Sequence, residues 1–258
     1  MHLLIDNVKF AYKSYEALKG VTFELRDSEF LCIVGPNGSG KSTLIKCINR
    51  ILAPKQGEVL LDGRRINGMK QYEVARNFGY VPQNGYIDFD RPRVFDVVLM
   101  GRRPYITWQY QESDIEKVWD ILSKLGIIHL AMRRFDELSG GQQQKVLIAR
   151  ALAQEAKVLL LDEPTSNLDI RHQLEVMNLI KNLIVTNGIS AIAAIHDLNL
   201  ASMYCDKILM MKEGKIFAAG TPSSVLTPKN IREVFGVDVA VHNNDGKIRI
   251  FVLNIVSS

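Results

Sequence analysis

Residues 35–42 read GPNGSGKS, and they directly follow the apolar run Phe30–Val34. The spacing matches G-x-x-x-x-G-K-[ST], which forms a phosphate-binding loop when it stands between a strand and a helix. In such a loop the glycines let backbone N–H groups curl around phosphate oxygens, and Lys41 supplies a positive charge. The hydroxyl of Ser42 binds Mg²⁺. The stretch therefore predicts a strand, a phosphate loop and a helix that begins at Lys41.

The whole loop contributes to the predicted nucleotide site. Lys41 is expected to act in catalysis as well as in binding, because its charge lies on the β- and γ-phosphates. Thr43 adds a donor near the α-phosphate. The predicted contacts are Gly35, Pro36, Asn37, Gly38, Ser39, Gly40, Lys41, Ser42 and Thr43.

Two acidic residues end a second apolar run, in VLLLDEP at residues 158–164. Pro164 stops the strand, and an acid at the carboxyl end of a buried parallel strand lies at the ligand edge of the sheet. Asp162 is the expected Mg²⁺ ligand, through water. Glu163 is expected to orient or deprotonate the attacking water. Beside a phosphate loop, this pair predicts a nucleoside triphosphatase.

A serine and two glycines precede another helix, in LSGGQ at residues 138–142. Backbone N–H donors and a hydroxyl at a helix N-terminus suit an anion. The chain thus has two phosphate-binding devices, although one nucleotide needs only one.

The remaining pattern alternates strands and helices, which is typical of an α/β fold. Strands are predicted at residues 3–8, 21–25, 30–34, 57–63, 78–83, 158–161 and 189–195, and helices at 41–49, 170–186 and 198–205. The runs 158–161 and 189–195 are apolar throughout, as in strands buried on both faces. The expected sheet is largely parallel, with an antiparallel part near the N-terminus.

A helical insertion and a terminal hairpin complete a predicted single domain of residues 1–258. Residues 90–153 lack strand alternation and contain both the LSGGQ stretch and a helical stripe of Ile115, Val118, Trp119, Leu122 and Leu125. Residues 1–89 and 154–235 form the predicted core. Residues 236–258 alternate around Asn244-Asp245-Gly246, a hairpin signal.

Composition narrows the class of protein. The 258 residues carry 32 basic and 28 acidic side chains, a net charge of +4 that is too balanced to indicate a nucleic-acid partner. No signal peptide and no apolar run of about 18 residues are visible. The basic pairs are interpreted as solvated: Arg64-Arg65, Arg102-Arg103 and Arg133-Arg134.

The cysteines and most histidines carry no motif. Three widely spaced cysteines form no metal-binding pattern and fit a reducing cytosol; they are Cys32, Cys47 and Cys205. Four histidines have no supporting context and are interpreted as structural or exposed; they are His2, His129, His172 and His242.

The motifs together resemble ABC-type ATPases over nearly the whole chain. The resemblance rests on their order: the phosphate loop, LSGGQ at 138–142, LLLDEP at 159–164, SNLD at 166–169 and AIHD at 194–197. It implies a P-loop NTPase fold with a RecA-like core, and ATP with Mg²⁺ at the site.

The same resemblance implies roles for four further residues. Gln83 of YVPQ is expected to contact Mg²⁺ and the attacking water, and His196 to contact the γ-phosphate. Asp169 is expected to cross to the partner subunit. Tyr12 is expected to stack on adenine, a role that Phe10 or Tyr15 could also fill.

The resemblance also explains the second phosphate-binding device. Two chains of this family pack head to tail, and the LSGGQ helix start of one caps the γ-phosphate bound by the loop of the other. The expected contacts to the partner's nucleotide are Ser139, Gly140, Gly141 and Gln142.

Two longer stretches indicate a class of transporter. VFDVVLMGRRPYITW at residues 94–108 and the segment 194–220 resemble importer ATPases for iron chelates such as siderophores, haem and cobalamin. Such a subunit works as a homodimer on the cytoplasmic face of the membrane. It docks on permease subunits that receive cargo from an extracytoplasmic binding protein. The alternatives are a zinc or manganese importer ATPase and a soluble assembly-type ABC ATPase.

Overall fold

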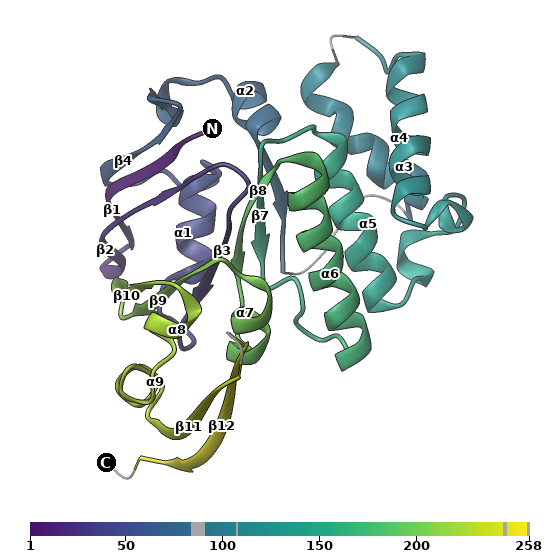
Figure 1. Cartoon of the computed structure of the whole chain (residues 1–258). Helices are drawn as coiled ribbons and strands as arrows, with labels where there is room; N and C mark the ends of the chain where they lie inside the picture. The colour runs from purple at the N-terminus through teal and green to yellow at the C-terminus, as the bar shows by residue number, and fades with distance from the viewer. Residues whose placement is uncertain (84–90, 107, 245–246, 257–258) are drawn as a thin grey trace. The chain divides into compact units, whose positions relative to one another are not determined.

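The computed structural model describes residues 1–83, 91–106, 108–244 and 247–256, in a chain that divides into two compact units (Figure 1). Unit 1 comprises residues 1–68 and 190–258, and unit 2 comprises residues 69–189. Because unit 2 interrupts unit 1 in the sequence, unit 1 is built from both ends of the chain.

An antiparallel sheet begins unit 1. Its strand order is β2-β1-β4-β5, with bounds β1 Leu3–Tyr12, β2 Tyr15–Leu25, β4 Gln56–Leu61 and β5 Arg64–Arg65. β1 and β2 are longer than predicted and meet at a tight turn, where Tyr12 pairs with Tyr15. Register shifts along this pair interrupt the alternation of buried and exposed side chains, so the sequence pattern underestimates both strands.

Parallel strands form the second sheet of unit 1. β3 (Phe30–Val34) pairs in parallel with β8 (Ser190–Ala194) and β9 (Lys207–Lys212), and β10 (Lys215–Gly220) pairs antiparallel with β9. Every residue of β3 and β8 is buried, as their apolar runs predict. The phosphate-loop helix α1 (Lys41–Ile48) contacts β8. The fold is therefore α/β with parallel central strands and an antiparallel β part, which confirms the predicted fold class.

Short helices and a pair of strands complete unit 1. Their bounds are η1 Ile66–Gly68, α7 Leu198–Tyr204, α8 Pro222–Val225, α9 Pro228–Phe235, β11 Val237–Asn244 and β12 Lys247–Ile255. β12 is fixed to α7 because Asn199 Oδ1 accepts from the Ile250 amide at 2.8 Å, while Asn199 Nδ2 donates to the Ile250 carbonyl at 3.2 Å. The predicted turn residues Asp245 and Gly246 lie outside the described residues.

Unit 2 combines two parallel strands with helices. β6 (Phe78–Val81) pairs in parallel with β7 (Val158–Asp162), which is buried throughout. The helices are α2 Gln71–Asn77, α3 Val94–Leu99, η2 Met100–Tyr105, α4 Glu112–Lys124, η3 Ile128–Leu130, η4 Phe135–Glu137, α5 Gly140–Ala153 and α6 Ile170–Asn187. Helix α5 contacts α3, α4 and α6 (Figure 1). Within the described part of the chain, every helix is too short or too polar to cross a membrane.

The helical stripe of α4 is confirmed in part, because Ile115 is exposed and Ile121, outside the predicted stripe, is buried. Val118 and Leu122 are buried, and the Trp119 ring lies 4.8 Å from that of Phe95 on α3. Helix α2 was not predicted, because Val74 is its one buried residue and a single apolar position gives no periodicity.

The interpretation of Arg102 as a solvated residue is wrong. Its side chain is buried, and its Nε donates to Asp114 Oδ1 at 2.8 Å. A second nitrogen donates at 2.8 Å to both the Ala153 carbonyl and Glu155 Oε2. These partners compensate the cost of burying a charge. Burial raises the pKa of Asp114, but hydrogen bonds from Arg102 and the Gln111 amide hold that pKa below its usual value. Arg102 therefore joins η2, α4 and the end of α5.

Two of the three cysteines form a disulfide bond within unit 1. Cys32 of β3 is joined to Cys205, which directly follows α7, with Cα atoms 5.9 Å apart. This distance is typical of a disulfide bond. The sequence gives no sign of the pair, because the two residues are 173 positions apart. The bond is contrary to the interpretation of the cysteines as fitting a reducing cytosol. Cys47 remains a free thiol, and burial raises its pKa to about 12.

Reduction of Cys32–Cys205 should destabilise the protein. The bond closes a long loop, and such a bond contributes about 2–4 kcal/mol by restricting the unfolded chain. We expect the melting temperature measured by circular dichroism to fall by several degrees in the presence of a reductant, and a similar fall in Cys205→Ser without one. Cys47→Ser is the matched control, and its melting should still respond to reductant. Equal melting of the wild-type protein with and without reductant would contradict this expectation.

Candidate active site

Close packing explains two glycines of the loop at residues 35–42. Gly35 has a φ of +154°, and a Cβ there would lie 2.7 Å from Ser39 Oγ and closer still to the Met211 carbonyl of β9. Gly40 has a φ of +104°, and a Cβ there would lie 2.6 Å from the Ala17 carbonyl. Any side chain at either position would collide with backbone, so both positions require glycine.

Lys41 reaches back over this loop. Its side chain is buried, and its Nζ donates to the carbonyls of Gly35 at 2.8 Å and Pro36 at 3.0 Å. The amide of Leu44 donates to the Gly40 carbonyl at 2.9 Å, which begins α1. These two hydrogen bonds hold the ammonium group against the loop that the sequence predicts to bind phosphate.

Two features of the loop suit an anion. Among the described residues, no side chain caps the N-terminus of α1, and a helix start of this kind suits an anion. The hydroxyl of Ser39 is buried and has no hydrogen-bond partner in the described part of the chain. Buried polar groups normally have partners, and an oxygen of a phosphate bound in this loop would be a suitable acceptor.

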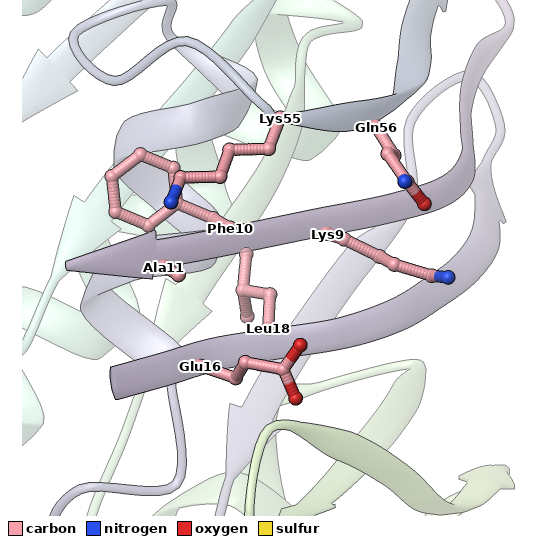
Figure 2. A pocket seen from close by; sticks show the side chains of 7 residues that line it. All are labelled: Lys9, Phe10, Ala11, Glu16, Leu18, Lys55 and Gln56. Atoms are coloured by element: carbon pink, nitrogen blue, oxygen red, sulfur yellow. The ribbon is translucent and has the colours of Figure 1, made fainter. Parts of the chain in front are cut away.

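Two tyrosines lie against the loop. The Tyr12 hydroxyl is 3.5 Å from Thr43 Oγ1, and the Tyr12 ring meets Phe10 edge to face with centroids 4.9 Å apart. The Tyr15 hydroxyl donates to the Gly38 carbonyl at 3.3 Å. Phe10 itself lines a hollow of about 210 Å³, together with residues that include Leu18 and Lys55 (Figure 2). Tyr12 and Tyr15 both touch the loop, and Phe10 also stays a candidate for the adenine contact.

His196 follows β8 at the same sheet edge from which the loop emerges. The parallel register pairs Ile33 of β3 with Ala194 of β8, so the two strands end together. The amide of Ile195 donates to the Ile33 carbonyl at 3.0 Å. Asp197 then caps α7 by accepting from the amides of Asn199 and Leu200. His196 is exposed between these two anchors.

Gln83 and the acidic pair come together in unit 2. β6 and β7 run parallel, so Gln83 and Glu163 follow strands that end at one edge. Gln83 Nε2 donates a hydrogen bond to Glu163 Oε2. Asp162 is buried and accepts from the Tyr80 hydroxyl at 3.5 Å. Burial, followed by the charge of Asp162, raises the pKa of Tyr80.

Glu163 has a left-handed backbone conformation, with a φ of +53°. This conformation costs a residue with a side chain roughly 1–2 kcal/mol. The Glu163 carbonyl accepts from both the amide of Ser166 at 3.1 Å and its hydroxyl at 2.9 Å. These bonds stabilise the turn that directs the carboxylate toward Gln83. Strained residues of this kind cluster at functional sites.

The LSGGQ stretch forms the start of α5, as predicted. Ser139 is its N-cap: the Ser139 hydroxyl accepts from the Gln142 amide at 3.4 Å, and the Ser139 amide donates to Gln142 Oε1 at 3.1 Å. Gly140 and Gly141 form the first turn. A hollow of about 380 Å³ opens beside this turn, lined by residues that include Ser139, Gln142 and His172.

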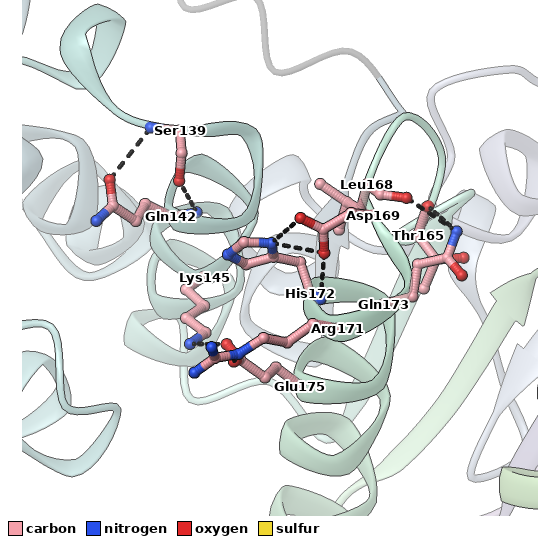
Figure 3. Close-up of polar contacts among 10 residues, drawn as sticks. All are labelled: Ser139, Gln142, Lys145, Thr165, Leu168, Asp169, Arg171, His172, Gln173 and Glu175. Atoms are coloured by element: carbon pink, nitrogen blue, oxygen red, sulfur yellow. Dashed lines mark hydrogen bonds and ion pairs between the residues drawn. The ribbon is translucent and has the colours of Figure 1, made fainter.

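Asp169 caps α6 and is paired with a histidine that sequence reasoning missed. Asp169 Oδ1 accepts from the His172 amide at 2.8 Å, and His172 Nδ1 lies 2.8 Å from both carboxylate oxygens (Figure 3). These bonds, the amide first, lower the pKa of Asp169. The spacing of three residues from an N-cap aspartate is the signal that could have indicated His172.

The family model described as ABC transporter matches residues 18–166, which is more than half of the chain. The chain therefore belongs to the ABC transporter family, and within it to the ATP-binding subunits that hydrolyse ATP.

Named relatives agree with this membership. An uncharacterized ABC transporter ATP-binding protein of Methanocaldococcus jannaschii is 47% identical, over 95% of this chain and 96% of its own length. A cobalamin import ATP-binding protein of Halobacterium salinarum is 41% identical, over 87% of this chain but 56% of its own length. A ferric enterobactin transport ATP-binding protein of Escherichia coli is 38% identical, over 90% and 86%.

Solved structures share the fold. A protein assigned to the metal-chelate type of ABC transporter, in an inward-facing conformation, gives a TM-score of 0.84 at 29% identity, over 98% of this chain and 97% of its own. A dimeric ATP-binding cassette in a post-hydrolysis state, bound to ADP and Pi, gives 0.75 at 30% identity, over 85% and 98%.

The two tyrosines can be separated by nucleotide affinity. Loss of a stacked aromatic ring weakens the binding of a base by about 1–3 kcal/mol. If Tyr12 stacks on adenine, Tyr12→Ala should weaken ATP binding in a fluorescence titration, and Tyr12→Phe should not. Tyr15→Ala is the matched control, because it removes the other tyrosine that touches the loop. A larger loss in Tyr15→Ala would transfer the adenine contact to Tyr15.

Proposed function

We propose that this chain is the ATP-hydrolysing subunit of an importer for metal chelates, and that it works as a head-to-tail homodimer. The observation that carries the catalytic part is the hydrogen bond between Gln83 and Glu163 beside buried Asp162. A carboxylate held by an amide can orient and deprotonate a water molecule.

Unit 1 supplies the groups that bind the triphosphate. In the proposed complex, Lys41 exchanges the carbonyls of Gly35 and Pro36 for β- and γ-phosphate oxygens, while the loop amides surround the remaining charge. Ser39 gains the acceptor that its hydroxyl lacks in the described part of the chain. His196 contacts the γ-phosphate, and Tyr12 stacks on adenine.

Mg²⁺ fits the proposed site by the chemistry of its ligands. The described residues contain no cluster of three or more histidine, cysteine or acidic side chains. Mg²⁺ bound with a nucleotide needs few protein ligands, because phosphate oxygens and water fill the other positions. The hydroxyl of Ser42, the amide oxygen of Gln83 and the carboxylate of Asp162 are the proposed ligands. Bound there, the ion would neutralise charge on the phosphates.

The dimer explains the remaining groups. Ser139, Gly140, Gly141 and Gln142 form a helix start suited to an anion, although their own chain already has a phosphate loop. We assign them, with Asp169, to the nucleotide of the partner chain. The dimeric state of the related cassette bound to ADP and Pi supports this assignment.

The relatives support a metal chelate as the cargo. Their names specify cobalamin import and ferric enterobactin transport, and the structural relative is assigned to the metal-chelate type. The proposed partners are transmembrane permease subunits, with an extracytoplasmic binding protein that delivers an iron siderophore, haem or cobalamin. The subunit would then lie on the cytoplasmic face of the membrane.

The first test of this function is Glu163→Gln. The substitution keeps the size of the side chain and removes the base, so ATP hydrolysis should fall by at least about 10²-fold. ATP binding should persist, and the variant should form a dimer with Mg·ATP but not with ADP in size-exclusion chromatography. A variant that cannot bind ATP would assign Glu163 a structural role.

The second test concerns cargo. Cells that lack this gene should lose the uptake of a radiolabelled iron siderophore, haem or cobalamin, and should take up zinc and manganese normally. Complementation with the wild-type gene, but not with Lys41→Ala, would tie the defect to ATP use. The reverse pattern of uptake would favour a zinc or manganese importer. Co-purification with soluble scaffold proteins instead of a permease would favour an assembly ATPase.

A further inference from the structure

The two glycines of the LSGGQ stretch pack against the residues around Asp169, all within unit 2. A Cβ added to Gly141 would lie 2.8 Å from His172 Cγ and 3.1 Å from its Cβ, and closer still to Cδ2. A Cβ on Gly140 would lie 3.3 Å from Leu168 Cδ2. Gly141 does not have a positive φ. Its lack of a side chain is therefore explained by the neighbouring imidazole and not by backbone strain.

His172 is itself fixed by Asp169. Its amide and its Nδ1 both lie 2.8 Å from Asp169 oxygens, and Figure 3 shows the ring between Asp169 and the turn formed by Ser139 and Gln142. The His172 ring thus contacts both Asp169, the N-cap of α6, and the first turn of α5.

The turn before α6 is held by further bonds. Gln173 Nε2 donates to the carbonyls of Thr165 at 3.3 Å and Leu168 at 3.1 Å (Figure 3). Asp169 is therefore held in a defined position relative to α6. His172 links Asp169 to the first turn of α5.

We propose that His172 is a positioning residue that joins Asp169 to the LSGGQ turn, so that one chain presents both groups to its partner's nucleotide as a single piece. The proposal rests on the proposed function, in which both groups act across the dimer. It also gives Gly141 a second role: its missing side chain leaves the space that the His172 ring occupies.

A double substitution tests the link. Gly141→Ala should lose most ATP hydrolysis, because the new Cβ displaces the His172 ring. His172→Ala should lower kcat with little change in ATP affinity, since the phosphate loop of unit 1 is intact. The combination Gly141→Ala/His172→Ala should hydrolyse ATP faster than Gly141→Ala alone, by roughly 2- to 100-fold, the range of coupling between residues in contact.

Two further variants separate positioning from simple packing. His172→Asn keeps a side-chain N–H for Asp169 and should retain more activity than His172→Leu. Glu175→Gln is the matched control, because Glu175 forms another link between α5 and α6, accepting from Lys145 Nζ at 2.8 Å. In the described part of the chain its hydrogen bonds go to Lys145 and Arg171 and not to the LSGGQ turn or Asp169, so the kcat of this variant should stay close to that of the wild type. For every variant, kcat and KM are measured on the full chain, and ATP binding is followed by fluorescence of a labelled nucleotide.

The possible outcomes are distinct. If the double variant is as inactive as Gly141→Ala, the glycine is required by the approaching nucleotide and the proposal is wrong. If Glu175→Gln reproduces His172→Ala, the effect is general packing of α5 on α6, and the proposal is again wrong. If the wild-type chain itself neither hydrolyses ATP nor dimerises with it, the proposed function fails instead.

Discussion

The parallel pairing of β3 with β8 and β9 places the groups of unit 1 that would bind a nucleotide. β3 runs parallel to both neighbours, so the loop that follows it emerges at the edge formed by the carboxyl ends of these strands. Gly35 follows at once and packs on the Met211 carbonyl of β9. The neighbouring strand β8 brings His196 to the same edge. The loop, Lys41 and the histidine thus depend on one set of backbone hydrogen bonds.

Unit 2 carries its own connected set of groups. Gln83 meets Glu163, Asp162 meets Tyr80, and the carbonyl of Glu163 is held by Ser166. The unfavourable backbone angle of Glu163 is compensated within this turn. Glu163, the LSGGQ helix start and Asp169 therefore belong to one compact unit, whereas the loop at residues 35–42 belongs to the other. The predicted site residues are therefore distributed over the two units.

The features that could be predicted from the sequence depend on residues close together in the chain. Spacing and composition identify features that depend on neighbours in the chain. These are the loop at 35–42, the buried runs ending at Val34 and Leu161, and the helix start in LSGGQ at 138–142. The missed features depend on contacts between distant residues. Arg102 is buried because Asp114 and Glu155 reach it, and His172 matters because Gly141 packs against it. No local pattern encodes these distant contacts, although the spacing of three residues between Asp169 and His172 is local.

The bond between Cys32 and Cys205 has a topological consequence. These cysteines lie on either side of residues 69–189 in the sequence, so the whole of unit 2 is enclosed in a covalent ring that begins and ends in unit 1. A single backbone cut anywhere within that ring opens it without releasing a fragment. A protease that nicks unit 2 would therefore leave a molecule of unchanged mass, apart from one added water, until the disulfide bond is reduced.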